Sequence, residues 1–548
     1  MKFKANWAFN VVSFSLLFSA LIFAYSNHFY NPFHFDDFHT IADNVAIRSL
    51  ENWPAFFSDP KTFSTIPSHQ SYRPIITLSL AIDYALSDKI STLQFHISMF
   101  IVYLAQLVLI YLFFKHLLIL SGYQAAAKIA LIGTAIYGLH TANAETLNYI
   151  ISRSDLYSTF FLVLAFCLYQ YRAYLLLRCL SLLALGLAVL SKEAAAMYPA
   201  LLVAYILLFD QQQHLQLNSK LIKILFACIW RTLPEFLVGF GLLGFSLHMS
   251  PHWEPGGTSR LDYLQTQIYI IAHYIFTFFA PVNLSADSDF ELIRSPTDTR
   301  IFLGTLLLLS ILTYAIRCSR ISKLRPVSFG IAWFFLTLCP TSSIIPLAEV
   351  QNDHRIFLPY IGLTLAVTVS FTHLLTWISA HYRINNSKIR MTVTAFLIIF
   401  FSLHVYSIRQ RNRVWSSAEA LWFDVATKSP KNGRGLMNYG LSQMEKGNYA
   451  IAEDYFMRAL ILTPNYSTLH INLGILYSAQ NKSDQAEMYF SRAIQLNPSE
   501  PSAYYYYARW LASINRRSEA LSKLEEALRL SPNYADAIEL KKLLLQSS

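Results

Sequence analysis

Charged residues are scarce in this chain of 548 residues. Asp, Glu, Lys and Arg together make up 14% of it, whereas 54% of the residues are hydrophobic. Soluble globular domains carry about 25% charged residues, so this composition argues against a wholly soluble protein and favours a membrane protein. The formal net charge of +10 comes from Lys and Arg scattered through short loops rather than from one basic stripe, so no nucleic-acid partner is expected.

Cysteines are also few. The five, Cys167, Cys179, Cys228, Cys318 and Cys339, stand singly within apolar segments, without CxxC or metal-type spacing. Neither a disulfide framework nor a zinc site of cysteines is therefore expected. A signal-peptide cleavage signal is missing as well, because no small-residue site follows the apolar run from Trp7 to Ala24. That run is expected to be an uncleaved first span.

Long apolar runs are abundant. A helix of about 17 to 25 apolar residues crosses a bilayer, and about eleven such spans are predicted near 7–28, 94–120, 128–144, 156–173, 174–191, 195–209, 224–248, 300–318, 327–346, 356–380 and 391–408. The stretches 74–86 and 263–281 are interrupted or aromatic-rich, and we expect them to be helices at the interface. Residues 1–410 are thus predicted to form an all-α, polytopic membrane domain.

The distribution of charge sets the expected topology. With a cytoplasmic N-terminus, the basic residues fall in the inside loops, among them Lys115, Lys128, Arg172 and Arg178, and most acidic residues fall in the opposite loops. Lys and Arg in short loops orient membrane proteins. Because the number of spans is odd, residues 411–548 are predicted to lie outside the cytoplasm.

Residues 411–548 contain an internal repeat of 34 residues. The spacing is followed by Pro430, Pro464, Pro498 and Pro532, by Ala452, Ala486 and Ala520, and by Ala459, Ala493 and Ala527. This period is typical of tetratricopeptide repeats. We therefore predict a short α-solenoid of about three and a half repeats, whose concave face suits an extended peptide or a partner protein.

Ionisable residues beside membrane spans are candidates for function because their burial is unfavourable. The first cluster follows the first span and contains the adjacent pair Asp36 and Asp37. Two neighbouring carboxylates suit general-base work or a divalent cation, although an ordinary acidic loop has the same composition. Arg73 follows downstream, just before a predicted interfacial helix, where an arginine is commonly a membrane-surface anchor.

The second cluster runs from His140 through Glu145 and Arg153 to Asp155. In a helix, Glu145 and Arg153 lie two turns apart on nearly one face, so an ion pair between them is the simplest expectation.

The third and fourth clusters lie at the ends of later spans. Lys192 and Glu193 end the fifth span, a pattern equally typical of a plain helix terminus. His354 and Arg355 follow an acidic stretch before the tenth span. The planar guanidinium group suits a phosphate, although a lone arginine at such a place is also typical of a snorkelling side chain.

The order of these clusters, their predicted side of the membrane and the attached repeats resemble a known family. It is that of the transmembrane-and-tetratricopeptide-repeat O-mannosyltransferases and their bacterial relatives, which have the type C glycosyltransferase fold. The resemblance covers nearly the whole chain and is carried by residues 35–37, Asn44, 71–74, 140–155, 191–193, 284–287 and 355–359. One departure is His354, which stands where the family commonly has Glu, so a carboxylate role there would fall to Asp353 or Glu349.

The resemblance implies an enzyme that moves a mannose-like sugar from a polyprenyl-phosphate carrier to a protein or glycan acceptor. Position by position, Asp36 or Asp37 would be the catalytic base, and Arg153, Lys192, Arg355 and Arg73 would bind the carrier phosphate. Supporting roles would fall to His140, Glu145, Asp155, Glu193 and His354. We expect no metal or other cofactor, because a positively charged phosphate site removes the need for a cation, although the paired aspartates leave a divalent metal open.

Two other functions stay open. A non-catalytic membrane-anchored scaffold would use the repeats to gather envelope proteins, but an anchor needs one span and leaves the ionisable clusters without a purpose. A transporter or flippase for lipid-linked sugar predicts charges near the bilayer midplane, whereas here they lie at span ends. Short loops around a multi-span core favour a bacterial inner membrane with periplasmic repeats, and the endoplasmic reticulum is the alternative location.

Overall fold

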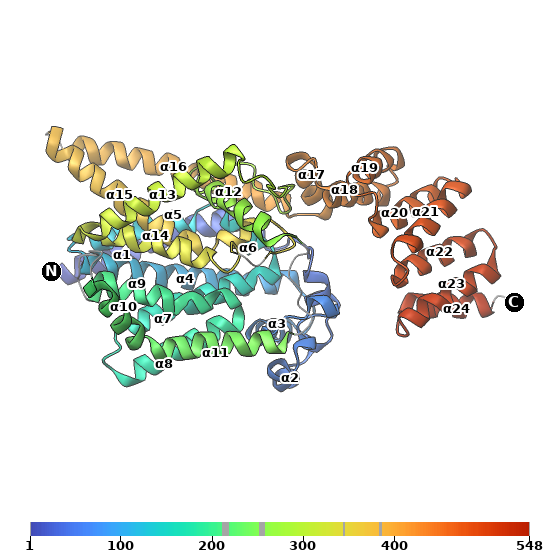
Figure 1. The fold of residues 1–548 in the computed structure, drawn as a ribbon, viewed down its shortest axis with the longest axis horizontal. Coiled ribbons are helices and arrows are strands. Elements are labelled where there is room, and N and C mark those ends of the chain that lie inside the picture. The colour runs from blue at the N-terminus through green and yellow to red at the C-terminus, as the bar shows by residue number, and fades with distance from the viewer. Residues whose placement is uncertain (1, 211–218, 251–257, 344–345, 383–385, 547–548) are drawn as a thin grey trace. The chain divides into compact units, whose positions relative to one another are not determined.

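The computed structural model describes residues 2–210, 219–250, 258–343, 346–382 and 386–546. The chain divides into two compact units: unit 1 comprises Met1–Leu284 and Phe290–Ser416, and unit 2 comprises Ser285–Asp289 and Ser417–Ser548. Every regular element of the described residues is a helix, as the all-α prediction requires (Figure 1). The chain therefore passes through unit 2 twice.

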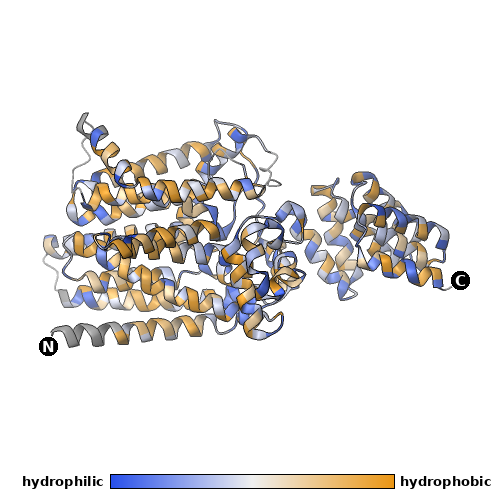
Figure 2. Cartoon of the chain, turned by 90° about the horizontal axis from the view of Figure 1, so that it is seen from below, coloured by the Kyte–Doolittle hydropathy of each residue, from blue (hydrophilic) through white to orange (hydrophobic). Residues whose placement is uncertain are grey.

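The α-helices of unit 1 follow the apolar runs. In the described ranges they are α1 (Lys2–Tyr25), α2 (Trp53–Ser58), α3 (Pro74–Ser87), α4 (Thr92–Leu120), α5 (Ala126–Gly138), α6 (Asn143–Asn148), α7 (Arg153–Tyr169), α8 (Leu175–Ser191), α9 (Tyr198–Tyr205), α10 (Ser219–Arg231), α11 (Leu233–Met249), α12 (Arg260–Phe279), α13 (Thr299–Ser319), α14 (Arg325–Leu338), α15 (Pro359–Tyr382) and α16 (Asn386–Val414). Most residues of these helices are hydrophobic, and hydrophilic residues gather at the end of unit 1 where α2 and α3 lie (Figures 1 and 2).

Each predicted span overlaps at least one of these helices. Six helical stretches of the described residues are long and apolar enough to cross a membrane: Thr92–Leu120, Ile150–Tyr169, Glu193–Asp210, Thr299–Ser319, Pro359–Tyr382 and Ser387–Val414. A seventh span is possible if Lys223–Arg231 and Leu233–Met249, which meet at 65°, count as one. The other predicted spans correspond to shorter helices, and α3 and α12 lie where interfacial helices are predicted.

The span predicted at 128–144 is too long, because α5 ends at Gly138. Side chains take up the carbonyl groups that the next helical turn would use. Tyr103 donates from its hydroxyl to the Gly138 carbonyl over 2.8 Å, and the Asn143 amide donates to the Tyr137 carbonyl over 2.7 Å. Carbonyls capped in this way end a helix. A turn and the short helix α6 follow before α7 begins.

Two glycines bring α14 and α15 into backbone contact. A Cβ atom at Gly330 would collide with the carbonyl oxygen of Gly362, and one at Gly362 would collide with that of Gly330 and with the Trp333 side chain. Small residues allow helices to approach closely in this manner. The contact fixes the spacing between the N-terminal half of α14 and the N-terminus of α15.

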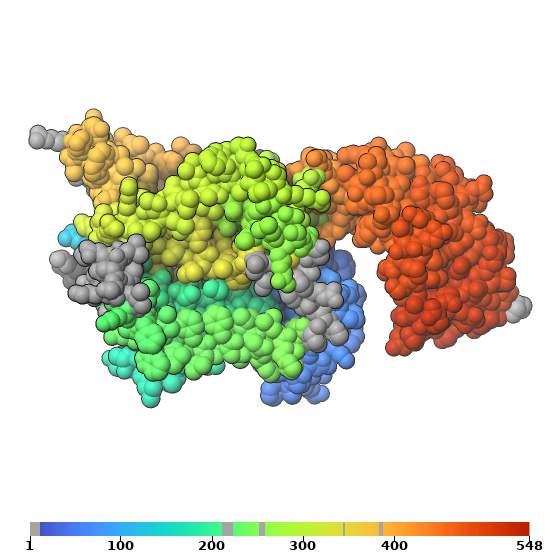
Figure 3. Space-filling model, viewed as in Figure 1, coloured from blue at the N-terminus to red at the C-terminus, as the bar shows by residue number. Residues whose placement is uncertain are grey.

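Unit 2 is the predicted repeat solenoid. Its α-helices in the described residues are α17 (Ala418–Lys428), α18 (Gly433–Glu445), α19 (Tyr449–Leu462), α20 (Ser467–Ala479), α21 (Ser483–Leu496), α22 (Pro501–Ser513), α23 (Arg517–Leu530) and α24 (Ala535–Gln546). They pack in antiparallel pairs along a bent path (Figures 1 and 3). Gly440 and Gly474 leave room for the rings of Phe456 and Phe490, where a Cβ would approach to 2.8 and 2.7 Å.

The segment Ser285–Asp289 belongs to unit 2 although it lies far from the repeats in the sequence. The Arg434 guanidinium donates to the Asp287 carboxylate over 2.8 Å. The Lys431 backbone N–H donates to Asp289 over 3.1 Å, and the Asn432 amide donates to the Ser288 carbonyl over 3.1 Å. The segment thus caps the start of α18.

Candidate functional site

Asp37 is an anchor of the first loop. Its side chain is fully buried, and it accepts hydrogen bonds from the backbone N–H groups of Ile151, over 2.8 Å, and His34, over 3.1 Å. Burial raises the pKa of Asp37 to about 7. These bonds join the loop that follows α1 to the segment between α6 and α7, so this carboxylate holds two distant parts of unit 1 together.

Asp36 has the opposite environment, with 48% of its side chain exposed. His39 Nε2 lies 3.2 Å from Asp36 Oδ1, and His69 Nδ1 lies 4.0 Å from the same oxygen. Although burial acts to raise it, the two imidazole rings hold the pKa of Asp36 below its usual value. Asp36 is therefore the ionised and accessible member of the aspartate pair.

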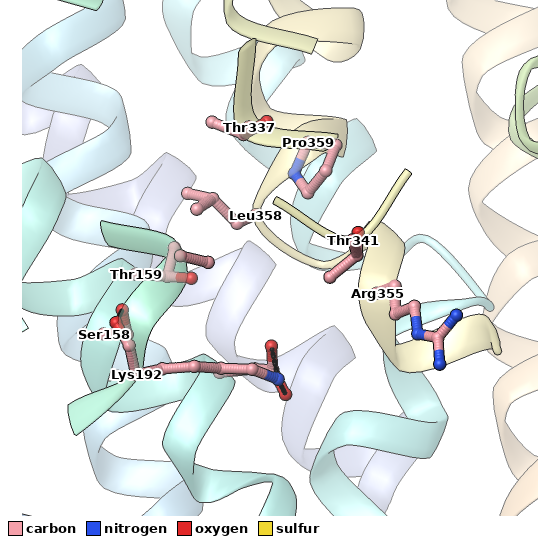
Figure 4. A pocket seen from close by; sticks show the side chains of 10 residues that line it. Ser158, Thr159, Lys192, Thr337, Thr341, Arg355, Leu358 and Pro359 are labelled. Atoms are coloured by element: carbon pink, nitrogen blue, oxygen red, sulfur yellow. Dashed lines mark hydrogen bonds and ion pairs between the residues drawn. The ribbon is translucent and has the colours of Figure 1, made fainter. Parts of the chain in front are cut away.

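Lys192 and Arg355 line one small pocket (Figure 4). Lys192 Nζ lies 2.7 Å from both carboxylate oxygens of Asp155, which α7 carries. Arg355 lies on the other side of the pocket, and its Nη1 donates to the Glu349 carbonyl over 2.9 Å. The cavity holds about 20 Å³, so a phosphate group enters only if these side chains move.

The remaining wall of this pocket is formed by small and apolar residues: Ser158, Thr159, Ala194, Thr337, Thr341, Leu358 and Pro359. Three of their hydroxyl groups donate to backbone carbonyls, those of Ser158, Thr337 and Thr341. The wall combines the end of α14 with the start of α15, which the two glycines hold together.

Arg73 and Glu193 pair with each other beside this pocket. The guanidinium donates to both carboxylate oxygens, over 3.2 and 3.0 Å. The Arg73 charge also lies 5.7 Å from the centre of the Phe63 ring. A bidentate pair of this kind holds an arginine in a fixed orientation.

Arg153 does not pair with Glu145, and the predicted ion pair is wrong. The Arg153 side chain is fully buried and binds Asp83 of α3 over 2.8 Å. A 3₁₀ turn, Ile150–Ser152, separates α6 from α7, so Glu145 and Arg153 do not share one helix. Asp83 was not among the predicted site residues, because it lies in a stretch that the sequence marks only as an apolar interfacial helix.

Glu145 instead joins two other parts of unit 1. Its Oε1 accepts from the backbone N–H of His354 over 3.2 Å and lies 3.2 Å from His354 Nδ1, and Arg411 lies 3.8 Å away. Burial and the nearby Asp353 raise the pKa of Glu145 well above its usual value. Arg411, near the end of α16, is a second residue that the sequence did not single out.

His140 lies apart from these charges in a buried aromatic environment. Its Nε2 contacts the Phe278 carbonyl over 3.0 Å, and its ring stacks on that of Phe278. Burial and the neighbouring His404 lower the pKa of His140 to about 3. This histidine packs the turn between α5 and α6.

Three of the four predicted cations, Lys192, Arg355 and Arg73, lie around His354, whereas Arg153 does not. Burial lowers the pKa of His354 well below that of free imidazole, and the positive charges of Lys192, Arg355 and Arg73 lower it further. Because the Coulomb energy falls with distance, an effect on the His354 pKa means that these three cations lie near its ring. Residues from three separate segments of the chain thus gather at one place in unit 1.

Comparison with known proteins gives related sequences for both units. Residues 433–499 and 471–535 match models of the tetratricopeptide repeat. A protein O-mannosyl-transferase from Caenorhabditis elegans is 23% identical over 469 residues, which are 82% of this chain and 63% of that protein. The chain is similar to protein O-mannosyl-transferases.

Two human protein O-mannosyl-transferases share this similarity. One is 22% identical over 87% of this chain and 54% of its own length, and the other is 23% identical over 84% and 56%. The chain thus spans between half and two thirds of the O-mannosyl-transferases that it matches. Both units contribute to the similarity, since neither alone covers so much of the chain.

Two solved structures match the chain with low TM-scores. A tetratricopeptide-repeat protein, YrrB, is 19% identical, with 34% of this chain and 91% of that chain covered and a TM-score of 0.22. The Cut9–Hcn1 assembly gives 15% identity, coverage of 86% and 89%, and a TM-score of 0.23. Scores of this size carry no argument about unit 1.

Proposed function

We propose that this chain is an integral membrane glycosyltransferase. It moves a mannose-like sugar from a polyprenyl-phosphate carrier to a hydroxyl group of a protein or glycan acceptor, on the non-cytoplasmic side of the membrane. The observation that carries the proposal is the pocket that Lys192 and Arg355 both line, with Asp155 of α7 paired to Lys192. The similarity to proteins named protein O-mannosyl-transferases supports it.

Lys192 and Arg355 bind the carrier phosphate in this proposal. The phosphate displaces Asp155 from Lys192, and the two cations then stabilise the negative charge that grows as the bond from the sugar to the phosphate breaks. Arg73 supports the site from its pair with Glu193. Arg153 is left out of the phosphate site, because it is buried against Asp83.

Asp36 is the catalytic base. A base must come within hydrogen-bond distance of the proton that it takes, and Asp36 is ionised and exposed whereas Asp37 is covered by backbone donors. The acceptor oxygen bonds to the sugar carbon, its proton passes to Asp36, and the carrier phosphate leaves. Asp37 positions its neighbour by fixing the loop.

The repeats of unit 2 bind the acceptor. A solenoid of helix pairs offers an extended concave surface, and a protein acceptor needs a binding surface larger than the transfer site itself. The location we propose is a bacterial inner membrane, with the repeats in the periplasm.

The test is sugar transfer by the purified full-length protein in lipid vesicles, with a polyprenyl-phosphate mannose donor. Acceptors are found first, as envelope proteins whose intact mass falls when the gene is deleted. Lys192→Ala and Asp36→Asn should each lower transfer at least about 100-fold. Arg300→Ala, which removes an exposed cation from α13, should leave it unchanged. Equal transfer by all four proteins would contradict the proposal and favour the scaffold.

A further inference from the structure

Asp36 has two imidazole neighbours that the proposed transfer reaction does not use. One ligand atom each of Asp36, His39 and His69 lies within 4.8 Å of the other two. His39 belongs to the turn Phe38–Ala42, whereas His69 ends the turn Pro67–His69. Residues from two separate loop segments therefore present two nitrogens and one oxygen to a common point.

The two loop segments are fixed to each other. The Thr65 backbone N–H donates to the His39 carbonyl over 3.1 Å. Ser64 Oγ contacts His39 Nδ1 over 2.9 Å, and the Gln70 amide donates to the Ser64 carbonyl over 3.3 Å. The ligand atoms are thus held by the fold and are not a chance grouping of free side chains.

Ser64 supplies a fixed hydrogen-bond partner for Nδ1 of His39. The Ser64 hydroxyl donates to the Ile66 carbonyl over 3.2 Å and accepts from the Ile66 N–H over 3.0 Å. With its proton directed to that carbonyl, Ser64 Oγ, 2.9 Å from Nδ1 of His39, is free to accept from Nδ1–H. A neutral His39 then directs the lone pair of Nε2 toward the carboxylate of Asp36, 3.2 Å away.

Two lone pairs at this distance repel each other unless a cation lies between them. His39 is more than nine-tenths buried, and its Nε2 has no aligned hydrogen-bond partner among the described residues. A proton between Nε2 and Asp36 would also remove this repulsion, but it would not explain why His69 Nδ1 lies 4.0 Å from the same carboxylate oxygen. A metal ion uses all three ligands.

We propose that Asp36, His39 and His69 bind a divalent first-row transition-metal ion such as Zn²⁺. Two histidines and one carboxylate, with an open position, are a common ligand set for such ions. Ligand atoms of a tetrahedral site lie about 3.4 Å apart at bond lengths of about 2.0 to 2.2 Å. The half-exposed ring of His69 has to move inward slightly to reach that spacing.

Ser64 would orient the metal ligand. A histidine that binds a metal generally donates its other N–H to a fixed acceptor, and Ser64 supplies that acceptor. The site shares no residue with the pocket of Lys192 and Arg355, so the ion acts on the acceptor side and not on the carrier phosphate. A hydroxyl group bound to such an ion loses its proton more readily; this last consequence rests on the proposed function, whereas the binding does not.

The binding is measured without any substrate. Full-length protein without a polyhistidine tag is purified in detergent, stripped with a chelator and titrated with Zn²⁺ by calorimetry, with metal content checked by mass spectrometry. We expect one equivalent to bind, and we expect His69→Ala to abolish this binding. Ser64→Ala should weaken it about 10- to 100-fold. His381→Ala, which removes an exposed histidine from α15, should have no effect.

Two outcomes overturn the proposal. One is that the unaltered protein binds no Zn²⁺ at micromolar concentrations. The other is that His69→Ala binds it as tightly as the unaltered protein, which leaves an imidazolium–carboxylate pair of His39 and Asp36. Thermal unfolding without metal shows whether each variant is folded, and His69 is exposed enough to be replaced safely. If the unaltered protein binds no Zn²⁺ but still transfers sugar in a way that Lys192→Ala abolishes, this inference fails and the proposed function stands.

Discussion

Asp36 and Asp37 are neighbours in the sequence with different environments. The backbone turns between them, so that one carboxylate faces the solvent beside two histidines and the other faces backbone N–H groups of a distant segment. The sequence identifies the pair but leaves open which member acts. The folded structure distinguishes them, because Asp37 is buried and Asp36 is half-exposed.

The two Asn variants should therefore fail in different ways. Asp36→Asn removes the proposed base from an exposed position and is expected to lower transfer by about 10² to 10⁴, with little change in thermal unfolding. Asp37→Asn loses one of two acceptors for buried backbone N–H groups and should cost about 1 to 3 kcal/mol of stability. Transfer assays and thermal unfolding of both variants check this. An Asp36→Asn protein with full transfer would contradict it.

The buried pair of Arg153 and Asp83 should matter for stability. Asp83→Ala leaves a guanidinium group buried without its counter-charge, which is expected to cost about 3 to 5 kcal/mol. Arg300→Ala removes the basic partner of a half-exposed pair and leaves Asp298 as the cap of α13, and such a change costs about 0 to 1 kcal/mol. Denaturation of the two proteins in the same detergent measures the difference. Similar stabilities would mean that water reaches Arg153.

At the scale of helices, the glycine contact between α14 and α15 controls the pocket. Thr337 and Thr341 lie at the end of α14, and Leu358 and Pro359 lie at the start of α15. A side chain added at Gly330 or Gly362 would push α14 and α15 apart, and with them the pocket residues that they carry. The spacing of the two helices is thus set by residues that do not touch the pocket.

Gly362→Ala should weaken transfer without removing a chemical group. Its Cβ would collide with the Gly330 backbone and with Trp333, so the helices must part, and overpacking of this kind costs about 1 to 3 kcal/mol. Gly241→Ala, in α11, meets nothing within 4 Å and serves as the control. Thermal unfolding and transfer should both fall for the first variant only. An unchanged Gly362→Ala protein would show that the helices adjust without consequence.

Helices and repeats were predictable because their signals are local. Apolar runs marked the helices of unit 1, and the 34-residue period marked unit 2. The early end of α5 was missed because the groups that cap it include the hydroxyl of Tyr103 on another helix. Asp83 and Arg411 were missed for the same reason, since their partners lie far away in the sequence.

For the whole molecule, the division into units does not follow the order of the chain. The sequence places one boundary at 410, whereas unit 1 continues to Ser416 and unit 2 includes Ser285–Asp289. The resemblance marks residues 284–287 without indicating that they join the repeats. Contacts such as that of Asp287 with Arg434 arise only in the folded chain.

This contact should be measurable as a coupling. Asp287→Ala and Arg434→Ala are each expected to destabilise unit 2, and the double variant should lose less than the sum, with a coupling of about 0.5 to 3 kcal/mol. Unfolding of the full-length protein, followed through the helix signal, gives the values. Glu526→Ala and Arg529→Ala form an exposed pair within α23 and serve as the reference. Additive effects of Asp287 and Arg434 would contradict the assignment of the segment to unit 2.

The double passage of the chain through unit 2 has a practical consequence for anyone who wishes to isolate the repeats. A fragment that starts at Ser417 lacks the acceptors for the Lys431 N–H, the Asn432 amide and the Arg434 guanidinium. Such a truncation loses these three hydrogen bonds at the start of α18, so we expect the first turn of that helix to fray. Splicing residues 285–289 ahead of Ser417 through a flexible spacer restores the missing acceptors.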